Sequence, residues 1–159
     1  MKLVSLVLAA STLALAACTT MPATTPAATT TEAPAADATL QQTASLMVSI
    51  GQHGEDASLE TINDLSAQLD AQVAAAPNDP FVLKLAAQSR RTLSGYSQDR
   101  AQRVALRHAA LAELDKALGL SAGSTESRIV TLNGQPTEVD LKDLADLRAQ
   151  LMHQVQTDR

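Results

Sequence analysis

The stretch SLETINDLSAQLDAQVAAAPNDPFVLKLAAQSRRTL, residues 58–93, contains the pattern that decides the fold. Apolar residues recur at helical spacing on both sides of its centre: Leu59, Ile62, Leu65, Leu69 and Val73 before it, and Phe81, Val82, Leu85, Ala86 and Leu93 after it. Between the two runs, Asp79 is a suitable N-cap and Pro80 suits a first helical turn. The stretch therefore predicts two helices, over 58–75 and 81–93. The short turn makes them antiparallel neighbours.

The same spacing continues in both directions along the chain. Upstream, it predicts a helix over 39–50 that ends at the Gly51–Gly54 segment. Downstream, it predicts a longer helix from about Gln98 to Leu118, for which we expect Ser97 to be the N-cap and Gly119 to be the end.

The C-terminal part has a different character. Residues 128–132 read RIVTL and are followed by Asn133-Gly134, a pair typical of a tight β-hairpin, and Pro136 keeps the return strand at an edge. We expect Asp140 to cap a final helix with the apolar face Leu141, Leu144, Leu147, Leu151 and Val155. An isolated hairpin is weak in water, so it should pack on the helices. The predicted fold is mainly α, with four to five amphipathic helices in antiparallel hairpins and one small C-terminal β-hairpin.

Charge is distributed in two blocks within a chain of net charge −5. Residues 39–79 contain acids but no Lys or Arg, whereas residues 80–111 contain one acid, Asp99, and the basic residues Lys84, Arg90, Arg91, Arg100, Arg103 and Arg107. The basic block either forms a face for an anionic partner such as phospholipid headgroups, or packs against the acidic helix before it. We favour the second interpretation. The acidic total and an aromatic content of 1% argue against a nucleic-acid partner.

The N-terminus reads as a targeting segment. Met1-Lys2 is followed by a largely apolar run over 3–15, the length of a signal-peptide core and too short to span a bilayer. Residues 19–38 are mostly Thr, Ala and Pro with no apolar period, which is typical of a disordered tether. We therefore expect a signal peptide over 1–17, a tether over 18–38 and a helical domain over 39–159.

Leu15-Ala16-Ala17-Cys18 resembles the lipobox of bacterial lipoproteins, which consists of an aliphatic residue, two small residues and Cys. The resemblance implies that Cys18 is acylated, with palmitate or a related chain, and becomes the first residue of the mature protein. Two or three acyl chains anchor a protein stably to a membrane without spanning it. Thr19, in place of Asp, implies an outer-membrane location facing the periplasm. The alternative is an ordinary secretory signal cut after Ala14-Leu15-Ala16.

Two further resemblances concern the domain itself. AAAPNDPFVLKLAAQ (residues 74–88) and LDKALGL (114–120) resemble the helix junctions of tetratricopeptide-like repeats, although no 34-residue period is present. YSQDRAQRV (96–104) is similar to a stretch of OmpA-like peptidoglycan-binding domains, which would make the fold α/β and Arg100 a ligand-binding residue. That family's acidic ligand residue has no counterpart, because Gln88 and Ser89 occupy its place.

The sequence shows no recognisable catalytic constellation. His53, His108 and His153 are scattered, and none has a second metal-ligating residue at helical spacing on its own face. His108 and Asp115 share a helix side but lie about 10 Å apart. We expect no metal and no cofactor. The sequence favours a non-catalytic scaffold that binds an envelope protein or peptidoglycan; the alternatives are an OmpA-like peptidoglycan binder and an enzyme with an unrecognised site.

Overall fold

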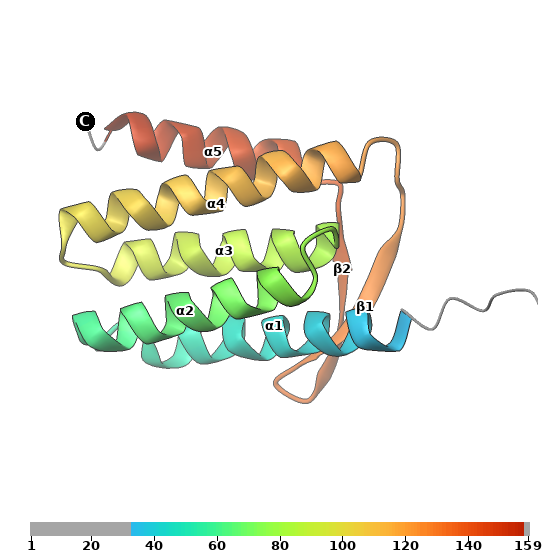
Figure 1. Ribbon diagram of the computed structural model, residues 1–159, viewed down its shortest axis with the longest axis horizontal. Helices are drawn as coiled ribbons and strands as arrows, with labels where there is room; N and C mark the ends of the chain where they lie inside the picture. The colour runs from blue at the N-terminus through green and yellow to red at the C-terminus, as the bar shows by residue number, and fades with distance from the viewer. Residues whose placement is uncertain (1–32, 158–159) are drawn as a thin grey trace, which may run out of the picture. The chain divides into compact units, whose positions relative to one another are not determined.

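The computed structural model describes residues 33–157, which form five helices and one β-hairpin (Figure 1). The elements are, in chain order, α1 (Ala33–His53), α2 (Leu59–Ala75), α3 (Pro80–Tyr96), α4 (Arg100–Leu120), β1 (Ser127–Leu132), β2 (Gln135–Asp140) and α5 (Leu144–Thr157). The predicted fold class is therefore confirmed. The α/β alternative is wrong, because residues 81–93 lie entirely within α3.

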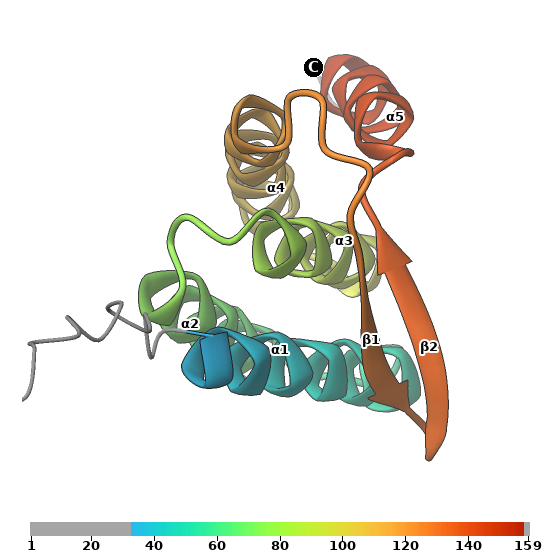
Figure 2. The ribbon, with the colours of Figure 1, turned by 90° about the vertical axis from the view of Figure 1, so that its right-hand side faces the viewer.

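Helix α3 lies at the centre of the bundle. Figure 2 shows α1 and α2 on one side of it, α4 and α5 on the other, and the hairpin running along one edge from α5 to α1. Every residue from Phe81 to Ala87 is buried. The helix contacts α1, α2 and α4, whereas α5 packs on α4. A helix enclosed on several sides needs apolar residues around most of its circumference, and residues 81–87 of α3 meet this need apart from Lys84.

The junction between α2 and α3 forms as the sequence predicts. Ser58 caps α2 by accepting a hydrogen bond from the Thr61 N–H at 3.1 Å. Asp79 caps α3, since its Oδ1 accepts from the N–H groups of Phe81 and Val82 at 2.9 and 3.3 Å. These side chains satisfy amide groups that have no partner within the helix.

The hairpin is also confirmed, and it packs on the helices. Asn133 and Gly134 have φ values of 51° and 77°, as both central residues of a type I′ turn require. Val130 and Val139 enter the core. On the edge of β1, the Gln41 side chain accepts from the Thr131 N–H at 2.8 Å and donates to the Thr131 carbonyl at 2.9 Å. One glutamine of α1 thus satisfies both backbone groups of an edge residue.

Helix α1 is longer than predicted at both ends. It begins at Ala33 instead of 39, so residues 33–38 are helical and do not belong to the predicted tether. Alanine is the best helix former, and Pro34 is tolerated in a first turn. At the other end α1 passes Gly51 and closes with Gly54, whose N–H donates to the Ile50 carbonyl at 2.9 Å. Gly54 lies so close to the Tyr96 ring that a Cβ there would overlap it.

Further predicted helix ends are wrong. Helix α3 continues past residue 93 to Tyr96. Asp99, not Ser97, caps α4, because its side chain accepts from the Gln102 N–H at 2.7 Å, and Ser97 instead closes α3. Helix α4 then passes Gly119 and ends at Leu120. Asp140 belongs to β2 and its carboxylate accepts from the Lys142 N–H, so α5 begins only at Leu144. In each case two plausible stop or cap residues lie within a few positions, and the tertiary packing selects between them.

The signal peptide predicted over 1–17, Cys18 and the tether up to residue 32 lie outside the described residues. Within residues 33–157, no helix combines the length and the apolar character needed to cross a membrane.

Candidate interaction groove

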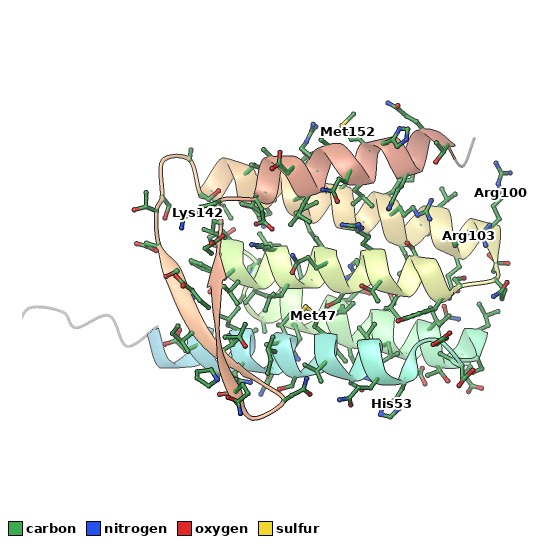
Figure 3. All side chains as sticks on the ribbon, turned by 180° about the vertical axis from the view of Figure 1, so that it is seen from behind. Met47, His53, Arg100, Arg103, Lys142 and Met152 are labelled. Carbon is green, nitrogen blue, oxygen red and sulfur yellow. The ribbon has the colours of Figure 1, made fainter. Side chains whose placement is uncertain are left out.

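A groove runs along α3 between α1 and α5. Helix α5 packs on α4, and Thr92 and Gly95 of α3 stay exposed. In Figure 3, α3 lies between α5 and α1, and Met47 points from α1 toward α3. The groove has a volume of about 440 Å³ and is lined by Met47, Gln88, Arg91, Thr92, Ser94, Gly95, Tyr96, Arg107, Leu147 and Gln154.

The two walls of the groove contribute apolar side chains. Met47 of α1 and Leu147 of α5 pack against the main core cluster, yet both stay partly exposed. Tyr96, at the end of α3, packs in the same way against the second core cluster. The groove thus offers apolar surface that continues into the core.

Two arginines give the groove positive charge. Arg91 Nη1 donates to Gln150 Oε1 at 3.2 Å. Arg107 donates to Ser94 Oγ and to the Gln154 carbonyl, both at 3.2 Å. Among residues 33–157, no residue that lines the groove is Asp or Glu. The groove therefore suits a ligand that has both apolar groups and negative charge.

A buried ion-pair cluster lies on the other side of α3. Arg90 is 3% exposed and donates to Glu113 Oε1 at 2.8 Å, Asp70 Oδ1 at 2.6 Å and Ser66 Oγ at 3.0 Å. Burial raises the pKa of the Glu113 carboxyl, and the neighbouring Arg90 opposes that rise. Glu113 Oε2 is buried without a hydrogen-bond partner. The cluster links α2, α3 and α4, and Arg90 donates a hydrogen bond from each of its three guanidinium nitrogens.

Two further buried or half-buried cations fasten the hairpin to the bundle. Lys84 pairs with the Asp143 carboxylate and donates to the Asp140 carbonyl. The Lys142 N–H lowers the pKa of the Asp140 carboxyl. Arg128 pairs with Asp79 at 2.6 Å and lies 4.6 Å above the Phe81 ring centroid. Sequence reasoning missed these contacts because each joins residues far apart in the chain.

The residues singled out from the sequence do not come together. Arg100 is exposed at the start of α4, at the end of the bundle opposite the hairpin, and is not a lining residue of the groove (Figure 3). His53, His108 and His153 are exposed on α1, α4 and α5. Asp115, considered as a partner of His108, instead pairs with Arg148. Among residues 33–157 no group of three or more His, Cys, Asp or Glu side chains could hold a metal ion.

The structure divides the basic block of the sequence between both interpretations. Arg90 packs against the acidic helix α2 through Asp70, as the favoured interpretation predicts. Arg91, in contrast, faces the groove and contacts a neutral residue. No protein family, curated protein or solved structure matches the chain.

Proposed function

We propose that this protein is a lipid-anchored envelope lipoprotein whose helical domain is a scaffold that binds another envelope component, a protein or peptidoglycan, through the groove between α1 and α5. The observation that carries the proposal is the groove itself, which combines the apolar side chains of Met47 and Leu147 with the Arg91 guanidinium, whose described hydrogen bond goes to a neutral amide oxygen. Such a surface binds by contact, charge and hydrogen bonding.

The anchor in this proposal is Cys18. The sequence Leu15-Ala16-Ala17-Cys18 supports diacylglyceryl transfer to the thiol, followed by cleavage before Cys18 and acylation of the new amino group. Two or three acyl chains would hold the protein on the membrane, with the domain facing the periplasm and Thr19 favouring the outer membrane.

The segment between the anchor and α1 would set the reach of the domain. Residues 18–32 precede the first helix, and their Thr/Pro/Ala composition favours an extended chain. At about 3.1 Å per residue such a segment reaches on the order of 45 Å. The groove could then meet a partner well away from the lipid surface.

In-cell photo-crosslinking tests the proposal. A photoreactive amino acid replaces Thr92, on the groove floor, in the full chain; the matched control replaces Gln68, which is exposed on α2 and does not line the groove. We expect a specific adduct from position 92 and none from position 68. Equal adducts from both positions, or none from position 92, would contradict the binding role.

A second variant tests the anchor. Cys18→Ser removes the only thiol in the chain, so acyl labelling should disappear and the protein should leave the membrane fraction. The adduct at position 92 should weaken, because the domain is then no longer held near its partner. Acyl labelling that persists in Cys18→Ser would show that the lipobox interpretation is wrong. Reproducible hydrolase or transferase turnover by the purified chain would show that the domain is an enzyme.

A further inference from the structure

We infer that the occupant of the groove is an acidic amphipathic peptide segment of a partner protein, with a carboxylate on Arg91 and apolar side chains between Met47 and Leu147. The inference rests on the proposed function and names the chemistry of the partner at that same groove.

The charge of Arg91 is the first argument. Among the described residues, no carboxylate lies within 4.0 Å of its guanidinium, and its one hydrogen bond goes to a neutral amide oxygen. By contrast, each of Lys84, Arg90, Arg128 and Arg148 pairs with at least one carboxylate. A carboxylate arriving from outside would make two charge-assisted hydrogen bonds to the planar guanidinium of Arg91, stronger than the existing bond to Gln150.

The apolar walls are the second argument. Met47 and Leu147 come from helices on opposite sides of α3 and are both partly exposed. The lining residues Thr92 and Gly95 are exposed and have a small side chain or none, so they do not fill the groove. Apolar side chains from one face of a helical segment fit such a trough, and the unbranched Met47 can adapt its shape to them.

The concave shape favours a peptide over a lipid surface. A bilayer presents a broad plane of headgroups and is bound by a flat or convex basic face. Here the charge of Arg91 lies inside a hollow of about 440 Å³, a size that encloses a few side chains. An acidic peptide satisfies the shape, the apolar walls and the charge together.

Fluorescence anisotropy with the full chain in detergent micelles tests the inference. The probe is a fluorescein-labelled helical peptide of Leu, Ala and Glu, about four turns long, and its twin has Gln in place of every Glu. We expect the Glu probe to bind about tenfold more tightly than its twin, and to weaken between about 50 and about 300 mM salt.

Variants then locate the contact. Arg91→Gln should weaken the Glu probe about tenfold and leave the twin unchanged, and Arg91→Lys should restore part of the loss. Lys116→Gln is the matched control, because it removes an equal charge from an exposed position outside the groove. Its affinity for the Glu probe should stay that of the unmodified chain.

Three results would overturn the inference: equal affinity for both probes, an Arg91→Gln variant that matches Lys116→Gln, or anionic vesicles that compete with the Glu probe regardless of Arg91. An in-cell adduct of position 92 with peptidoglycan would also overturn it, while leaving the proposed function in place. The complete absence of an adduct at position 92 would remove both.

Discussion

Arg90 and Arg91 are consecutive residues of α3 with opposite surroundings. Arg90 is 3% exposed and holds side chains from α2 and α4, two of them carboxylates. Arg91, about 100° further around the helix, is half-buried and donates to one neutral side chain of α5. The arrangement of the neighbouring helices, and not the residue type, decides that one guanidinium contacts two carboxylates and the other a neutral amide.

The two arginines also face different neighbouring helices. Arg90 faces the side of α3 where α2 and α4 supply acids, whereas Arg91 faces the gap between α1 and α5. Asp37 is the one acidic residue of α1 and lies ten positions before Met47, so that wall has no acid near Met47. A guanidinium without an internal acid gains more from an external one.

Arg90→Met should produce the largest effect. It leaves the Glu113 carboxylate buried without its cation, and breaking one side of a buried pair costs about 3 kcal/mol of unfolding free energy. Urea denaturation monitored by circular dichroism measures the loss.

The double variant Arg90→Met, Glu113→Leu is the control for this prediction. It replaces both charges by apolar side chains, and we expect it to recover most of the loss, because the exposed Asp70 needs no partner. A double variant as unstable as Arg90→Met would mean that lost packing, not the unpaired acid, sets the cost.

Local patterns predicted most of the fold. The apolar period, the Asp79 cap and Asn133-Gly134 act within a few residues, and each forms the structure that it predicts. The ends of α1 and α5 were not predictable in this way. The start of α5 depends on Asp140 being held in β2 as well as on its cap chemistry.

The groove was beyond sequence reasoning for a physical reason. Its walls come from α1 and α5, the first and the last helix in the sequence. Arg91 donates a hydrogen bond to Gln150, which is 59 residues away in the sequence. The apolar residues around α3 do not reveal which side α5 leaves uncovered. Sequence reasoning grouped Arg91 with the basic block and selected Arg100, whereas the structure places Arg91 and Arg107, but not Arg100, in the groove lining.

Lys84→Met should have an intermediate effect, because it removes a buried cation whose acidic partners are more exposed than Glu113. Lys84 is 5% exposed, almost as buried as Arg90, but its acidic partners Asp140 and Asp143 reach solvent. Without Lys84 only Asp143 Oδ1 is buried, while the exposed parts of both carboxylates stay hydrated, so we expect a loss of about 1–2 kcal/mol in urea denaturation. A loss equal to that of Arg90→Met would show that burial of the cation alone determines the cost.

Glu113→Gln should change the pH dependence of stability. Because burial raises the pKa of Glu113 above 4.5, the folded state binds its proton more tightly than the unfolded state does. Glu113 therefore contributes most below pH 4.5, and its contribution falls as pH rises through the raised pKa. The glutamine variant lacks this decline, so its unfolding free energy should rise relative to the unmodified chain between acidic and neutral pH. A difference between the two chains that is independent of pH would contradict the raised pKa.

Arg91→Gln should have the smallest effect on stability and tests directly whether Arg91 differs from Arg90. The substitution removes one hydrogen bond to a neutral, exposed side chain and leaves no buried charge behind, so the unfolding free energy should change by less than about 0.5 kcal/mol. Arg90→Gln in a parallel urea titration provides the reference, because the same chemical change one residue earlier disrupts three contacts. If Arg91→Gln costs more than about 1 kcal/mol, Arg91 is structural like its neighbour, and the charge in the groove serves the fold. If the stability is unchanged, the half-buried charge of Arg91 does not stabilise the fold. This is the physical reason to look for its carboxylate on a partner.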